Sequence, residues 1–133
     1  ALRELVEPLA RLPAPAVALS VVGDERPVSG EVETTVLRVA QEAVTNALKH
    51  AGAAHVEVRL AFEPRAITLT IGDDGRGFDA AGASRDGRLG MTGMRERARH
   101  IGATLDITSQ NDAGTQVRLT LTEEKRRHVF ATS

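Results

Sequence analysis

Apolar and polar residues alternate in several short runs of the chain, which is the period-two pattern of strands buried on one face. The clearest runs are 55–62 and 66–72, and strands are also expected at 16–22, 105–108 and 115–121. Short polar turns at 63–65 and 111–114 join consecutive runs. The pattern therefore predicts two antiparallel hairpins and one further strand.

Helical periodicity marks three other segments, 1–12, 31–51 and 92–101. Residues Phe78 to Gly90 have no period and contain three glycines, which predicts a loop of about a dozen residues, a length typical of functional lids or disordered segments. The order of elements is helix, strand, helix, hairpin, loop, helix, hairpin. It predicts an α+β fold, a two-layer α/β sandwich with helices on one face of a mixed, mainly antiparallel sheet.

Composition narrows the classes of function. The 133 residues fit one domain, and a net charge of -1 provides no basic field for nucleic acid. The chain contains no cysteine, which excludes disulfides and thiolate metal sites, and its three aromatic residues are all Phe, too few for base stacking. No apolar run approaches the ~20 residues of a membrane span, so a soluble, cytoplasmic domain is expected.

An acidic residue stands where the core face of the 66–72 strand ends. Asp73 shares the parity of Ile67 and Ile71, and Gly75 and Gly77 follow it. Glycine permits a tight turn and leaves backbone amides open to close approach. A carboxylate on the buried side followed by a glycine loop indicates a pocket for a flat, polar ligand; the alternative is an ordinary Asp-Gly turn in water.

A polar stripe runs along the longest helix. Glu42, Asn46, Lys49 and His50 stand at positions i, i+4, i+7 and i+8 and therefore share one side of the helix. An amide and a carboxylate one turn apart suit a hydrated Mg²⁺. The two basic residues, a turn further on, are candidates to meet phosphates that share the metal; the alternative is a solvated helix face.

A third piece of candidate chemistry is the glycine-rich segment from Gly87 to Arg97, which runs into the last helix. Such a junction points free backbone amides and the positive end of the helix dipole at an anion, for which phosphate is the obvious candidate. Flexible linkers and helix caps also use glycine. The segment is neither a Walker loop nor a dinucleotide fingerprint.

Together and in this order, the three pieces resemble the ATP-binding fold shared by DNA gyrase, the Hsp90 chaperone, sensor histidine kinases and the MutL repair protein, known as the Bergerat fold. Residues 41–51 look like the N box of histidine kinases, and 73–78 look like their G1 box. Residues 90–97, Gly-Met-Thr-Gly-Met-Arg-Glu-Arg, are similar to the G2 box of kinases that signal to NarL/LuxR-type regulators. The resemblance covers Leu2 to Leu121 and includes Gly114-Thr115 before the last strand.

The resemblance implies a role for each residue near the base of ATP. Asp73 would accept a hydrogen bond from the adenine amino group, with Gly75 and Gly77 in the adjoining turn and Gly77 close to the base. Thr115 would support the base through water.

The resemblance also implies roles at the phosphates. Asn46 would ligate Mg²⁺, and Glu42 would polarise a water or the incoming nucleophile. Phosphates would face Lys49 and His50, and Gly90 and Gly93 would shape the lid and its helix. The family often begins its G2 box with Gly-x-Gly, and here the first of those positions is Arg88, which is a further candidate for phosphate contact.

The family's phosphate-accepting histidine lies on a separate dimerising hairpin, which nothing here matches. Residues 1–12 are therefore expected to end a connecting helix, 13–122 to form the ATP-binding catalytic domain and 123–133 to form a flexible tail. The implied function is transfer of the γ-phosphoryl group of Mg-ATP to that histidine, for delivery to a NarL/LuxR-type response regulator. An isolated domain of this kind is expected to be a monomer and the full protein a homodimer, with membrane anchoring left open.

Three rival functions share the fold. An anti-sigma factor would phosphorylate a serine of its antagonist, and the Gly-Met-Arg-Glu-Arg stretch argues against it. A non-catalytic ATP-sensing module would bind nucleotide only to change an interface, and intact Glu42, Asn46 and Asp73 argue against such decay. A gyrase-type ATPase would need a dimerising arm, for which this sequence supplies no match.

Overall fold

The computed structural model describes residues 4, 7–8, 16–49, 53–75, 85–110 and 114–122, with the backbone alone described at 16, 49, 85–92 and 110. Its elements, in chain order, are β1 (Ala16–Gly23), α2 (Gly30–Lys49), β2 (His55–Glu63), β3 (Ala66–Asp73), α3 (Arg85–His100), β4 (Thr104–Gln110) and β5 (Gly114–Thr122). All five predicted strands and the helices expected near 31–51 and 92–101 are present in this part of the chain.

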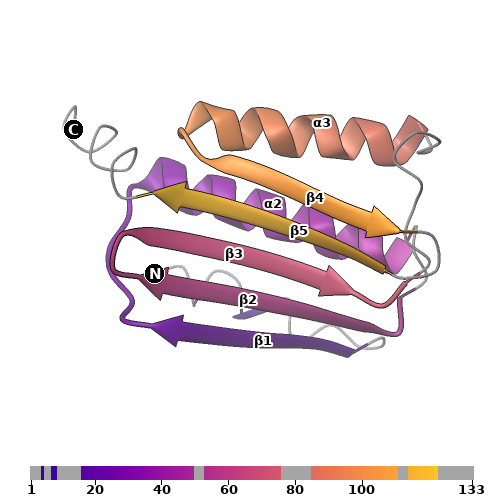
Figure 1. Ribbon diagram of the computed structural model, residues 1–133, viewed down its shortest axis with the longest axis horizontal. Coiled ribbons are helices and arrows are strands. Elements are labelled where there is room, and N and C mark those ends of the chain that lie inside the picture. The colour runs from indigo at the N-terminus through magenta and orange to yellow at the C-terminus, as the bar shows by residue number, and fades with distance from the viewer. Residues whose placement is uncertain are drawn as a thin grey trace.

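The strands form one sheet in the order β1-β2-β3-β5-β4 (Figure 1). Both hairpins, β2–β3 and β4–β5, pair antiparallel, and β3 also pairs antiparallel with β5. Since β1 and β2 are connected through the crossover helix α2, they run parallel. The sheet is therefore mixed and mainly antiparallel, as predicted.

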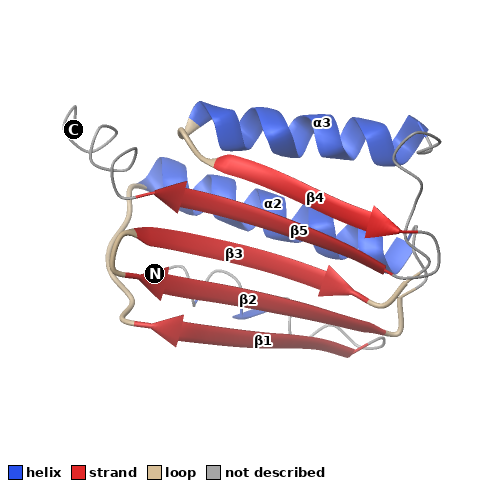
Figure 2. Ribbon diagram, viewed as in Figure 1, coloured by secondary structure: helices blue, strands red, loops and turns tan. Residues whose placement is uncertain are grey.

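Helices α2 and α3 cover one face of the sheet, and no other helix of the described residues covers the opposite face (Figure 2). The covered face follows from the alternating pattern, because every second residue of β2, β3 and β5 is buried. Aliphatic side chains of both layers make the core, including Leu60, Leu69, Ile71, Leu119, Val39, Val44 and Met94. The predicted two-layer α+β sandwich is confirmed.

The prediction of a loop up to Gly90 is wrong at its end, because α3 already begins at Arg85. Arg88 and Gly90, expected in a lid, therefore lie on this helix together with Gly93. Each glycine costs a helix only about 1 kcal/mol relative to Ala, and extending an existing helix is far easier than nucleating one. The half of α3 around Met94, which packs into the core, supplies that nucleus.

Some predictions fall outside the described residues. Of the expected first helix, only Glu4 and Glu7–Pro8 are described, in a helical and a 3-10 conformation respectively. Residues 76–84 of the expected loop and the tail from 123 are also outside the description. Within the described segments, no helix combines the length and apolar character needed to cross a membrane.

Candidate functional site

Asp73 ends β3 on the face that the helices cover, at the position its parity predicted. Its register partners are Val56 on β2 and Thr115 on β5. The carboxylate Oδ1 accepts a hydrogen bond from the amide of Gly75 at 2.8 Å. Burial raises the pKa of Asp73 above its usual range, although hydrogen bonds from the Gly75 and Thr115 amides lower it in part. Asp73 is thus a partly desolvated acceptor placed where the sheet ends.

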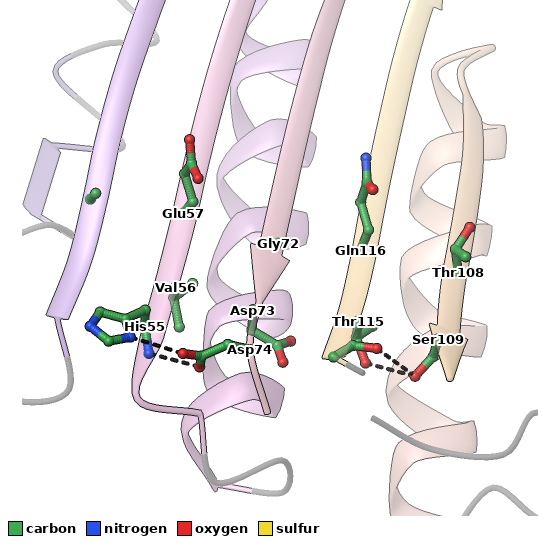
Figure 3. A pocket seen from close by; sticks show the side chains of 12 residues that line it. His55, Val56, Glu57, Gly72, Asp73, Asp74, Thr108, Ser109, Thr115 and Gln116 are labelled. Carbon is green, nitrogen blue, oxygen red and sulfur yellow. Dashed lines mark hydrogen bonds and ion pairs between the residues drawn. The ribbon is translucent and has the colours of Figure 1, made fainter. Parts of the chain in front are cut away.

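A pocket opens at this end of the sheet (Figure 3). Most of its lining residues, such as Glu57, Gly72 and Gln116, alternate with buried residues and therefore lie on the face of the sheet opposite α2 and α3. Asp73, Thr115 and Ser109 also border it, and the carboxylate of Asp73 lies on the side of β3 that faces Thr115. The hydroxyls of Ser109 and Thr115 are 2.8 Å apart, and Ser109 also donates to the carbonyl of Gly114 at 3.3 Å. Ser109 was not predicted as a site residue, because its contact with Thr115 depends on the β4–β5 register.

Gly114 allows β5 to begin directly beside Asp73. Its φ is +85°, in the left-handed region that favours glycine. A Cβ atom at this position would lie 2.1 Å from the carbonyl oxygen of Asp73, which no side chain permits. The close approach of β5 to the end of β3, and with it the position of Thr115, therefore requires this glycine.

Asp74 points away from Asp73 and braces the start of β2 (Figure 3). Its Oδ1 accepts hydrogen bonds from the amides of Ala54 and His55, both at 2.9 Å, and its Oδ2 lies 2.8 Å from Nδ1 of His55. The hydrogen bond from the His55 amide, followed by the one from the His55 ring, lowers the pKa of Asp74 to about 2. The sequence analysis did not predict this role. The available signal was that Asp74 follows Asp73 directly and therefore points to the face of β3 opposite the core.

Glu42 on α2 forms an ion pair with Arg97 on α3, between Oε1 of the carboxylate and the guanidinium. The other carboxylate oxygen, Oε2, is buried and has no hydrogen-bond partner in the described part of the chain. Gly93, one helical turn before Arg97, lies beside both side chains. The sequence predicted a site role for Glu42 and Gly93 but not for Arg97, since 55 residues separate the pair.

The remaining predicted residues are placed only in part. Asn46 is half-buried on α2, one turn beyond Glu42, and Gly75 is buried beside Asp73. Lys49 ends α2, and Arg88 and Gly90 lie on α3, with no side chain described; His50 and Gly77 fall outside the described residues. Two groups are thus brought together, one around Asp73 and Thr115 and one around Glu42 and Gly93. No hydrogen bond among the described residues joins the groups.

Known proteins resemble this chain in both sequence and fold. The oxygen sensor histidine kinase NreB of Staphylococcus carnosus is 43% identical over 89 residues, which cover 67% of this chain and 26% of NreB. The signal transduction histidine-protein kinase/phosphatase DegS of Brevibacillus brevis is 35% identical over 90 residues, 68% of this chain and 23% of DegS. The chain therefore spans a minor part of each curated relative's length.

Among solved structures, the histidine kinase domain of the blue-light activated histidine kinase from Erythrobacter litoralis EL346 superposes with a TM-score of 0.67. The match covers 98% of this chain and 61% of that one at 24% identity, and it supports the fold alone. The model of the "Histidine kinase-, DNA gyrase B-, and HSP90-like ATPase" family matches residues 31–125, which contain both groups of site residues. The chain belongs to this ATPase family, as its three motifs predicted.

Proposed function

We propose that this chain binds Mg-ATP and donates the γ-phosphoryl group to a histidine on a separate dimerisation domain, as the catalytic domain of a sensor histidine kinase. ATP binding follows from membership of the ATPase family. The observation that carries the proposal is Asp73, a partly desolvated carboxylate at the end of β3, with β5 drawn beside it by Gly114. Histidine as the acceptor is supported by the names of the relatives, NreB and DegS.

Asp73 suits adenine because an ionised carboxylate offers only acceptors. The exocyclic amino group of adenine is a donor, whereas guanine carries a carbonyl oxygen at the same ring position and would be repelled. Thr115, whose hydroxyl is held by Ser109, stands next to Asp73 on the neighbouring strand. These two side chains are proposed to select adenine, and Gly77 is proposed to lie close to the base.

The proposed metal is Mg²⁺, with Asn46 as its protein ligand. Magnesium usually keeps several waters and takes one or two protein oxygens together with substrate phosphates. The side-chain amide oxygen of Asn46, half-buried on α2, is proposed to supply the single protein ligand, with Glu42 one turn earlier left to orient the nucleophile. When bound, the ion neutralises charge on the phosphates. Lys49, His50 and Arg88 are proposed to face the phosphates.

The contribution of this chain to transfer is mainly positioning. In the transfer, a bond forms between an imidazole nitrogen of the acceptor histidine and the γ-phosphorus, and the bond from that phosphorus to the leaving oxygen of ADP breaks. Glu42 is proposed to orient the incoming nucleophile. Residues 13–122 would form this catalytic unit, with 1–12 as its connection to the dimerisation domain and 123–133 as a tail.

The proposed partners are the dimerisation domain of the same kinase and, through it, a response regulator of the NarL/LuxR type. The Gly-Met-Arg-Glu-Arg motif at 93–97 supports the regulator class. An isolated domain would be monomeric and the full protein a homodimer. The serine-kinase and ATP-sensing alternatives are not favoured, since the relatives bear the names of histidine kinases.

Calorimetric titration with a non-hydrolysable ATP analogue, with and without Mg²⁺ and in parallel with GTP, tests the nucleotide site. Wild-type protein should bind the ATP analogue in preference to GTP, and more tightly with Mg²⁺. Asp73→Asn should lose this preference, because an amide presents a donor as well as an acceptor. Asp106→Asn, an exposed acid on β4, is the control for the loss of one charge. Wild-type affinity in Asp73→Asn would contradict the assignment of Asp73.

Phosphotransfer is tested separately by incubating the chain with radiolabelled Mg-ATP and a supplied dimerisation domain. The expected product is an acid-labile phosphohistidine on the supplied domain. Selective ATP binding without any transfer, to either histidine or serine, would instead support the ATP-sensing module.

A further inference from the structure

The segment 93–97, Gly-Met-Arg-Glu-Arg, fixes α3 between two other elements. Met94 is 1% exposed and packs into the core. Arg95 donates to the backbone carbonyl of Leu105 on β4 at 3.2 Å. Arg97 points to the opposite side and reaches Glu42 on α2. The two arginines of this segment therefore have different partners, and only Arg97 contacts a candidate catalytic side chain.

The carboxylate of Glu42 is held asymmetrically. Oε1 is paired with Arg97, whereas Oε2 is buried without a partner among the described residues. Buried side-chain oxygens in proteins nearly always have a hydrogen-bond partner, and an exception points to a catalytic role or to a missing water or ligand. The pairing of Oε1 thus leaves Oε2 as the oxygen with acceptor capacity for a reactant or its water.

Gly93 leaves room beside this pair. A Cβ atom built on Gly93 would stand 3.4 Å from the Arg97 guanidinium and 3.9 Å from Glu42 Oε2; apart from its chain neighbours and the surrounding helix backbone, no other atom of the described residues would lie within 4 Å. The space next to Oε2 is therefore bounded by the ion pair itself. A methyl group at 93 would enter that space in ordinary van der Waals contact with the guanidinium.

We propose that Arg97 is a positioning residue for Glu42: its guanidinium holds Oε1 and so directs Oε2 at the nucleophile of the phosphoryl transfer. The inference rests on the proposed function of Glu42. A base or orienting group in an enzyme is commonly held in place by a third group that does not touch the substrate. Arginine suits this task because its planar guanidinium keeps its charge at every physiological pH.

If the Glu42–Arg97 ion pair had only a structural role, loss of Arg97 would lower stability and would not specifically slow phosphotransfer. The side chains of Arg97 and Glu42 are 39% and 31% exposed, and ion pairs with such access to solvent contribute little to stability. Loss of Arg97 should therefore leave the fold and ATP binding nearly intact while it slows transfer. Because Arg97 lies on α3, the orientation of Glu42 would also depend on where that helix sits.

The test compares single-turnover phosphotransfer from saturating Mg-ATP with ATP-analogue affinity in wild type, Arg97→Gln, Arg97→Lys, Glu42→Gln and the double variant Glu42→Gln/Arg97→Gln. Arg97→Gln should slow transfer on the order of tenfold while the dissociation constant stays within about twofold. Arg97→Lys should recover part of the rate, because an ammonium still pairs with Oε1. In the Glu42→Gln background, Arg97→Gln should have little further effect.

The matched control is Arg99→Gln, an exposed arginine of the same last turn of α3, which should transfer at the wild-type rate. An unchanged or faster transfer rate in Arg97→Gln would overturn the proposal. The proposal would also be overturned if Arg97→Gln reduced the transfer rate equally in the wild-type and Glu42→Gln backgrounds. Failure of wild type to transfer, despite binding ATP, would instead reject the proposed function. Thermal melts of every variant separate these outcomes from unfolding.

Discussion

Asp74 and His55 lock the end of β3 to the start of β2 through both side chain and backbone. The carboxylate of Asp74 accepts the His55 amide at 2.9 Å and lies 2.8 Å from Nδ1 of the ring, and the His55 carbonyl accepts the Asp74 amide at 3.3 Å. Asp73, the proposed adenine acceptor, immediately precedes this brace. The strand end that carries the site is therefore held from the side opposite Thr115.

Asp74 should make stability depend on pH in the acid range. Its pKa is lowered from 3.8 to about 2 in the folded protein, so its contribution is complete above the unfolded value and is lost as pH falls from about 4 towards 2. The urea midpoint of Asp74→Asn should lie below that of wild type at pH 6, and the difference should shrink as pH falls towards 2 and vanish only below it. Asp106→Asn controls for the loss of charge. A difference in urea midpoint between wild type and Asp74→Asn that stays constant with pH would contradict the stabilising role of the ionised Asp74 carboxylate.

Asp73 should have the opposite effect on stability. Since burial raises its folded-state pKa, the ionised form is disfavoured by folding, and stability rises as pH falls through that pKa. Asp73→Asn is therefore expected to raise the urea midpoint at pH 7 while abolishing adenine selection, as for other sites where function costs stability. The stabilisation should vanish below pH 4. A lower midpoint at pH 7 would show that the carboxylate is needed for folding.

Gly114 on β5 and Gly72 on the adjacent strand β3 provide a test position and a control for glycine substitution. Gly114→Ala places a methyl group 2.1 Å from the Asp73 carbonyl oxygen at a φ of +85° and should lower the free energy of unfolding by roughly 2–4 kcal/mol. Gly72→Ala meets no atom within 4 Å and should be neutral or stabilise by up to about 1 kcal/mol. Urea unfolding measures both changes. Equal effects would mean that β5 can shift away from Asp73 without cost.

Thr115 should contribute to nucleotide affinity through its hydroxyl. Thr115→Val keeps the shape of the side chain but removes the partner of Ser109 and the proposed water contact. The loss of about one hydrogen bond, roughly 1 kcal/mol, should weaken binding of the ATP analogue about fivefold. Thr104→Val, an exposed threonine of β4 that does not line the pocket in Figure 3, is the control. Calorimetry that finds equal affinities for the two variants would remove Thr115 from the site.

Local patterns predicted most of the fold. The alternation in 55–62 and 66–72 identified β2 and β3 and placed Asp73 on the helix-covered face, as the structure confirms. The missing period and the glycines of 78–90 predict a loop and a helix that begins at 92, seven residues after the observed start of α3 at Arg85, because packing of the other half of the helix sustains this glycine-rich part. The Gly114-Thr115 motif marks the start of the last strand, but no local pattern indicates the close approach of Gly114 to Asp73.

Local sequence patterns are sufficient to predict the class of fold, the family and the acid at the end of β3, because strand and helix periods and short motifs are local in the chain. Which distant side chains meet depends instead on tertiary packing. The Glu42–Arg97 pair spans 55 residues and the Asp74–His55 brace spans 19. Both depend on how α2 and α3 pack and on how β2 and β3 are registered. Such contacts arise from the simultaneous burial of several elements, which no local pattern encodes.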